Sequence, residues 1–108
     1  MYLKEKYYCS LHLRKNGTSV LGMSPLVNIM RNSDGKYLKP STGNWNIAPY
    51  DIPLVETAPG IYQYEIDMST FNDNPETYTL IYKYNNNGIT LAESELVHYE
   101  RKNRARLV

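Results

Sequence analysis

The sequence has one cysteine, Cys9, among 108 residues, so the chain cannot form an intramolecular disulfide. This excludes the small secreted domains that disulfides hold together, and packing alone must stabilise the fold. No apolar run approaches the roughly 20 residues of a transmembrane helix. The first residues mix charged and apolar side chains and lack the apolar core of a signal peptide. We therefore expect a protein made in the cytosol, without an export signal and without membrane contact.

Motifs for catalysis and cofactor binding are also missing. The six glycines form neither of the phosphate-binding patterns GxGxxG and GxxxxGK. A thiol nucleophile needs a base within reach, but Cys9 and His12 fall on opposite faces of an alternating strand pattern. The other histidine, His98, has no ligand neighbour at zinc spacing. We expect a protein that is not an enzyme and that holds no cofactor and no metal.

Two short polar segments have an alternative interpretation as sites. Asp67, Asn72, Asp73 and Glu76 offer oxygen atoms of the kind that bind calcium, but their spacing matches no EF-hand loop. The triplet Asn16-Gly17-Thr18 matches a glycosylation acceptor, but without a secretory route we interpret it as a turn. Asp and Asn are frequent turn residues, and we assign both segments to turns.

Charge is distributed unevenly along the chain. There are 12 Lys+Arg and 11 Asp+Glu, but four of the cations, Arg101, Lys102, Arg104 and Arg106, belong to residues 101–108. Residues 1–100 are therefore net acidic. Nucleic acid calls for a broad basic face, so we interpret this basic segment as a solvated tail or as a peptide that docks on an acidic protein surface. We divide the chain into a domain of residues 1–100 and a basic C-terminal tail of residues 101–108.

What the sequence has in quantity is tyrosine, with 11 residues, together with frequent turn signals such as Asn16-Gly17, Asp34-Gly35 and Pro59-Gly60. Between the turns, apolar and polar residues alternate, which predicts half-buried strands. The residues expected to face inward are Cys9, Leu11 and Leu13; Val27 and Ile29; Tyr62, Tyr64, Ile66 and Met68; and Tyr78, Leu80, Tyr82 and Tyr84.

Two segments need a more careful interpretation. Trp45–Ile47 and Ile52–Val55 predict short strands near Pro49 and Pro53, at a sheet edge or at a crossing between sheets, because proline cannot donate to a central ladder. Residues 89–99 fit either a helix or a strand. We predict a last strand from Ile89 to Tyr99 with a bulge near Ala92 to Glu95, which would restore the inward face.

About seven strands in some 100 residues, with no confident helix, are typical of an immunoglobulin-like two-sheet β-sandwich. A small β-barrel is the alternative. Most tyrosines then belong to the core or its rim. The aromatic residues that alternation leaves for contact with a partner are Tyr8, Trp45 and Tyr50, and the cations available for contact are those of the tail.

Several stretches resemble small immunoglobulin-like virion proteins of tailed bacteriophages: SPLVNIMRNSDGKYL, then GNW, then IPLVETAPGIYQYEID and LAESELVHY. The residues that carry the resemblance are Pro25, Val27, Arg31, Asp34, Gly35, Trp45, Pro53, Leu54, Glu56, Pro59, Gly60 and Tyr62. The resemblance covers residues 5–99 and stops before the tail.

The resemblance implies a non-enzymatic structural role in the virion. Such a protein decorates the capsid or serves as an accessory at the neck, the tail or the fibres, and its partners are other virion subunits, with self-association also compatible. A different class of function is a carbohydrate-binding or adhesion module, with Trp45 and Tyr50 as a stacking platform. A small enzyme ranks third, because no catalytic constellation supports it.

Overall fold

The computed structural model describes residues 7–66, 76–86 and 89–99, and within these residues it consists of strands and turns without a helix. The strands are β1 (Tyr7–His12), β2 (Arg14–Lys15), β3 (Thr18–Ser19), β4 (Leu26–Arg31), β5 (Lys36–Lys39), β6 (Asn44–Asn46), β7 (Ile52–Pro53), β8 (Val55–Ala58), β9 (Ile61–Ile66), β10 (Glu76–Asn86) and β11 (Ile89–Tyr99). The strand regions predicted from alternation are confirmed. Three of these strands are only two residues long, and the eight longer ones are one more than the seven predicted.

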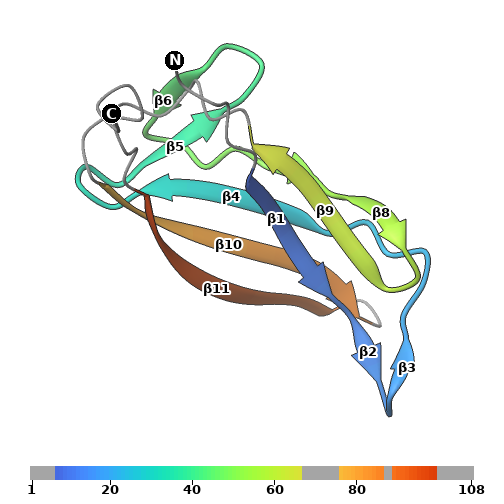
Figure 1. Cartoon of the computed structure of the whole chain (residues 1–108). Helices are drawn as coiled ribbons and strands as arrows, with labels where there is room; N and C mark the ends of the chain where they lie inside the picture. The colour runs from blue at the N-terminus through green and yellow to red at the C-terminus, as the bar shows by residue number, and fades with distance from the viewer. Residues whose placement is uncertain (1–6, 67–75, 87–88, 100–108) are drawn as a thin grey trace, which may run out of the picture.

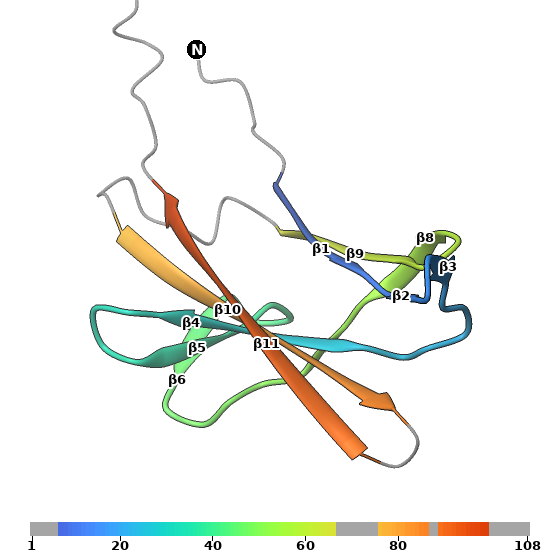
Figure 2. The same ribbon diagram turned by 90° about the horizontal axis from the view of Figure 1, so that it is seen from below.

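All pairings between these strands are antiparallel, and they build two main sheets. The smaller sheet has the order β1-β9-β8, and the larger has the order β11-β10-β4-β5-β6 with β7 attached to β4. Figures 1 and 2 show the two sheets as separate layers, with the β2-β3 hairpin projecting from one end. No pairing joins β1 to β11 in the described part of the chain, so the sheets form a sandwich-like arrangement and do not close into a barrel.

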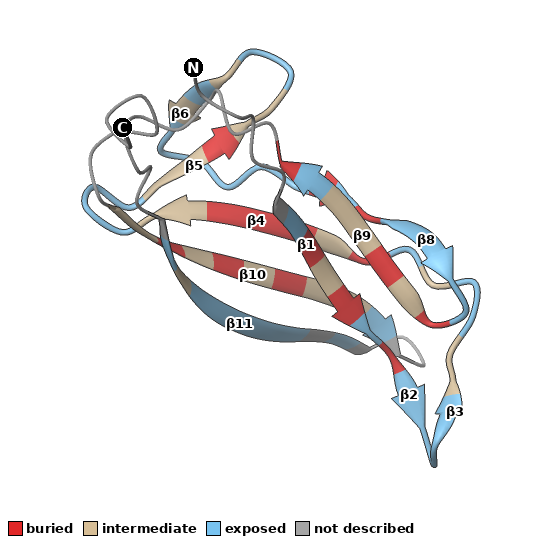
Figure 3. Ribbon diagram, viewed as in Figure 1, coloured by how far each residue is buried: buried red, intermediate tan, exposed pale blue. Residues whose placement is uncertain are grey.

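One core lies between the two sheets. Its buried residues come from alternate positions of strands in both layers: Cys9, Leu11, Leu13, Val27, Ile29, Leu38, Ile52, Leu54, Tyr62, Ile66, Tyr78, Leu80 and Tyr82. Figure 3 shows this alternation along β10, whereas β4 has three consecutive buried residues and the described side chains of β11 are exposed apart from the half-buried Val97. The predicted inward positions that the structure describes are therefore confirmed, with Tyr64 and Tyr84 packed at the margin of the core.

The prolines mark a crossing between the sheets, as predicted. Pro53 pairs with Leu26 of the larger sheet, whereas Val55 pairs with Gln63 of the smaller one. Leu54 lies between them, is buried, and donates its N–H to the carbonyl of Pro25. The chain thus changes layers within two residues. Pro53 is tolerated there because the strand is short, so its missing N–H does not interrupt a long ladder of hydrogen bonds.

The predicted bulge in the last strand is wrong. β11 pairs with β10 in one uninterrupted register, from Glu76 opposite Tyr99 to Asn86 opposite Ile89. The bulge was expected to restore the inward face of the strand, but the regular register already places Glu93 and Glu95 on the same face as Val97. Since β11 is an edge strand, its inner face opens to solvent at the side of the sandwich, and the two carboxylates can stay there. The irregular pairing that the structure does contain lies between β8 and β9, at Glu56 and Ala58.

Candidate functional site

The longest unpaired strand edge among the described residues belongs to β11. This strand pairs with β10 along its full length of 11 residues and with no other described strand. The other sheet margins are shorter, with six residues in β1, four in β8 and three in β6. An unpaired edge presents a row of N–H and C=O groups that can accept another strand.

The direction of these backbone groups follows from the ladder on the far side of β10. Asn32 donates its N–H to the carbonyl of Thr77 at 2.9 Å, in the register of the β4-β10 pair. In an antiparallel sheet, successive residues direct their backbone groups to opposite neighbours. Odd-numbered residues of β10 therefore bond to β4, and even-numbered residues bond to the odd-numbered residues of β11. The backbone groups of Ala92, Ser94 and Leu96 consequently point to the open edge.

Among the described strands, β1 pairs only with β9, so its other edge is open on the same side of the sandwich. Leu13 donates its N–H to the carbonyl of Gly60 at 2.8 Å, which continues the β1-β9 register. By the same rule, the backbone groups of Ser10 and His12 point away from β9. The two open edges, β1 and β11, border a space that we call the seam.

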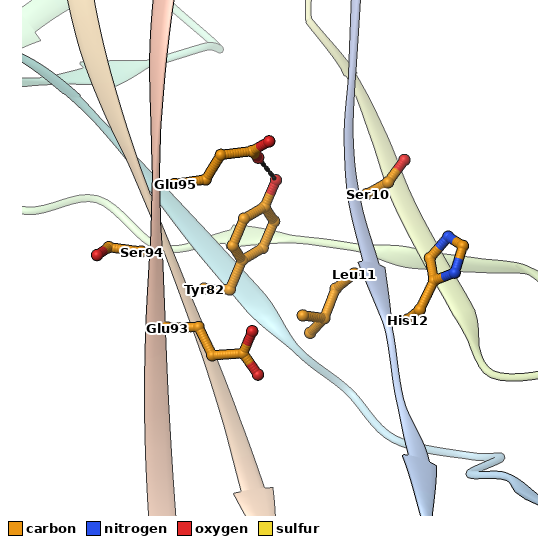
Figure 4. Close-up of a pocket in the computed structure, with 7 residues that line it drawn as sticks. All are labelled: Ser10, Leu11, His12, Tyr82, Glu93, Ser94 and Glu95. Carbon is orange, nitrogen blue, oxygen red and sulfur yellow. Dashed lines mark hydrogen bonds between the residues drawn. The ribbon is translucent and has the colours of Figure 1, made fainter. Parts of the chain in front are cut away.

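A groove of about 330 Å³ lies in the seam and is lined by Ser10, Leu11, His12, Tyr82, Glu93, Ser94 and Glu95. Figure 4 shows Tyr82 and Leu11 between the two strands, with the glutamates projecting from β11. Of the described residues that line this groove, two carry carboxylates and none is Lys or Arg. The groove therefore combines an apolar floor, a negatively charged wall and two rows of open backbone groups.

Tyrosine hydroxyls hold both carboxylates in place. Tyr82 donates to Glu95 Oε1 at 3.1 Å, and Tyr84 donates to Glu93 Oε2 at 2.8 Å. The hydrogen bond to Glu93 raises the pKa of Tyr84 above its ordinary value, with burial and the negative charge of Glu93 adding to the effect. Each carboxylate keeps further oxygen lone pairs for a donor from outside.

Cys9 lies beneath the seam and is completely buried. Burial, with the negative charge of Glu95 adding to it, raises the pKa of the Cys9 thiol to about 12. The thiol therefore stays protonated near neutral pH, which makes it a poor nucleophile. Within the described ranges, no group of three or more His, Cys, Asp or Glu side chains could hold a metal ion.

The aromatic residues proposed as contacts occupy three separate places. Tyr8 is 43 % exposed on the smaller sheet and donates to Glu65 Oε1 at 3.1 Å. Trp45 packs against the core, with its ring 5.7 Å from that of Tyr78 and the Arg31 guanidinium 4.6 Å from its centre. Trp45 thus contributes to packing at one end of the larger sheet.

Tyr50 lies on the opposite face of that sheet. Leu38 is buried and is the register partner of Trp45, so both face the core, and Lys39 then faces outward. The Lys39 ammonium lies 5.8 Å from the centre of the Tyr50 ring. Asn28, on the same outer face, donates to the carbonyl of Tyr50 at 2.6 Å. Trp45 and Tyr50 therefore do not form one stacking platform.

Several predicted features lie outside the described residues. These are the basic tail, with Arg101, Lys102, Arg104 and Arg106, and the calcium-type loop from Asp67 to Asp73; of the latter group only Glu76 is described. Sequence reasoning missed Glu93 and Glu95. Unbroken alternation from Ile89 to Tyr99 would have placed both glutamates with Val97 on the inner face. The predicted bulge broke that alternation, so the two glutamates were not recognised as inward-facing.

No helix long and apolar enough to cross a membrane occurs in the described part of the chain. No protein-family model, curated protein or solved structure matches this chain.

Proposed function

We propose that the domain is immunoglobulin-like. The order of the smaller sheet, β1-β9-β8, corresponds to strands B, E and D of an immunoglobulin domain. The order of the larger sheet, β11-β10-β4-β5-β6, corresponds to G, F, C, C′ and C″ of the variable type. The first strand of that fold, strand A, has no counterpart among the described residues, and its place beside strand B is the seam.

We further propose that the protein is a non-enzymatic structural component of a bacteriophage virion that docks onto capsid, neck, tail or fibre subunits. The observation that carries this proposal is the open edge of β11, since an added strand gains affinity from main-chain hydrogen bonds and specificity from alternate side chains. The resemblance of residues 5–99 to virion proteins supplies the kind of partner. The alternative function, carbohydrate binding, has less support, because Trp45 and Tyr50 face opposite sides of one sheet.

Particle composition tests the proposal. Phage particles released from cells that carry the gene for this chain are purified on a density gradient and analysed by quantitative mass spectrometry. We expect the chain at a fixed ratio to the major particle subunits. Its absence from purified particles would refute the virion role.

A proline variant links particle incorporation to the edge. Ser94→Pro removes an N–H that points to the open side of β11, so it should reduce incorporation while the fold persists. Ser94→Ala keeps the N–H and is the matched control, with incorporation like that of the wild type. Equal incorporation of both variants would show that docking uses another surface.

A further inference from the structure

The open edge of β11 carries two carboxylates beside its unpaired backbone groups. Glu93 and Glu95 lie two residues apart on the inner face, beside the backbone groups of Ala92, Ser94 and Leu96 that point outward. Residues two apart on a strand share a face. An added strand that carries cations two residues apart would therefore set both of them against this pair of carboxylates.

The same glutamates disfavour pairing of β11 with β11 of a second copy. In an antiparallel pair centred on Ser94, Glu93 of each copy would lie opposite Glu95 of the other. In the neighbouring registers, Glu93 or Glu95 would lie opposite its own counterpart. Like charges directly opposite each other destabilise a strand pair. Charges that face inward on an edge strand are a common safeguard against this type of self-pairing.

We propose that β11 accepts residues 101–106 of a second copy of this chain as an added strand. Arg104 and Arg106 are two residues apart in the sequence and match the spacing of Glu93 and Glu95. The donated strand would occupy the seam, where the described residues supply no first strand of the fold. This inference rests on the docking role proposed for the β11 edge and makes a second copy of this chain the virion subunit that docks there.

The residues at the required turn indicate that the donor is another copy and not the same chain. For its own tail to set Arg104 opposite Glu95 and Arg106 opposite Glu93, the chain would have to turn back at Tyr99-Glu100. Two-residue hairpin turns need positive φ angles, which Gly, Asn and Asp adopt readily. Tyr and Glu do not, and residues 99–108 contain no glycine. A turn that begins after Tyr99, the last residue of β11, would set Arg106 opposite Glu95 and Val108 opposite Glu93, so only one of the two charge pairs would form.

Charge reversal tests the exchange with full-length chains. One variant carries Glu93→Arg and Glu95→Arg, and the other carries Arg104→Glu and Arg106→Glu. Sedimentation velocity at increasing concentration measures self-association of the wild type and of each variant. We expect the wild type to self-associate. Each variant alone should associate at least ~10-fold more weakly than the wild type. An equimolar mixture should recover association, because each tail then meets a groove of opposite charge.

Glu65→Arg is the matched control. Glu65 accepts a hydrogen bond from Tyr8 at 3.1 Å, as Glu95 does from Tyr82, but it lies on the smaller sheet, away from the seam. Its self-association should equal that of the wild type. Near-ultraviolet circular dichroism checks that each variant is folded.

Two outcomes would overturn the inference. The first is that the wild type stays monomeric at every concentration. The second is that the mixture of charge-reversed variants associates no better than either variant alone, which is the result expected if each tail docks on its own chain. These results are independent of particle composition. Incorporation into particles without charge-dependent association would support the virion role and refute the tail exchange. Charge-dependent association of a chain that is absent from particles would refute the virion role and support the tail exchange.

Discussion

Proline at two adjacent positions of β11 should have very different effects on stability. The deduced ladder directs the N–H of Glu93 to Tyr82 of β10 and the N–H of Ser94 to the open edge. Proline lacks this N–H and is tolerated in a sheet where the missing donor would face solvent. Glu93→Pro therefore breaks a bond within the domain, whereas Ser94→Pro removes a donor that the isolated domain does not use.

The expected difference follows from the bond that is lost. Removing one ladder hydrogen bond costs about 1 kcal/mol net, and a carbonyl left without its donor adds about 1–3 kcal/mol where it is shielded from water. Tyr82, whose carbonyl is affected, is 3 % exposed. Ser94→Pro should cost about 1 kcal/mol or less, mainly through the fixed φ angle. We expect Glu93→Pro to be less stable than Ser94→Pro by about 2–3 kcal/mol.

Urea unfolding followed by circular dichroism measures this difference. Glu93→Ala and Ser94→Ala provide the references, because Glu93→Pro also loses the carboxylate that Tyr84 contacts. For a domain of this size, 2 kcal/mol corresponds to a shift in Tm of roughly 10 °C. If Ser94→Pro is as destabilising as Glu93→Pro after these corrections, the assignment of the open edge is wrong.

Three further predictions concern single positions. Gly60 has φ +73°, and a Cβ there would lie 2.9 Å from the carbonyl oxygen of Leu13, so Gly60→Ala should lower the free energy of unfolding by about 1–3 kcal/mol; an unchanged urea midpoint would contradict this. The buried Cys9 thiol, with a pKa of about 12, should react with iodoacetamide at pH 8 at least ~100-fold more slowly in the folded chain than in urea, and equal rates would disprove its burial. Hydrogen bonds from Lys83 and Asn28 lower the pKa of Asp51 below its ordinary value of 3.8, so its contribution is present above that value and is lost as the pH falls through the folded pKa. Urea titrations at pH 2–5 should therefore show a steeper loss of stability for the wild type than for Asp51→Asn, whereas parallel curves would refute the link.

The strands could be predicted because their causes are local. Alternation around Cys9, Val27, Tyr62 and Tyr78 reports which face of each strand is buried, and the structure buries these residues. The turn at Gly60 likewise has the positive φ angle that glycine adopts readily. Such patterns depend on neighbours within a few residues, so one sequence is enough to recognise them.

The candidate site could not be predicted because its causes are not local. A strand's pattern does not state whether it lies at the centre or the edge of a sheet, so nothing in the pattern of residues 89–99 indicated that an inner face could hold Glu93 and Glu95. Trp45 and Tyr50 are five residues apart and were expected to act together. They lie on opposite faces, because Trp45 pairs with Leu38 over the core while Tyr50 lies over Lys39.

The sequence by itself determined that this protein is all-β, where its strands and turns fall, and that its charge is divided between an acidic body and a basic tail. Only the tertiary structure decided that β11 ends a sheet and that its edge opens beside β1. It also decided that Tyr82 holds Glu95 and Tyr84 holds Glu93 at the groove between β1 and β11. The physical reason is that the order of strands in a sheet is set by contacts between residues far apart in the chain. Alternation records the burial of each strand but not the identity of its neighbour.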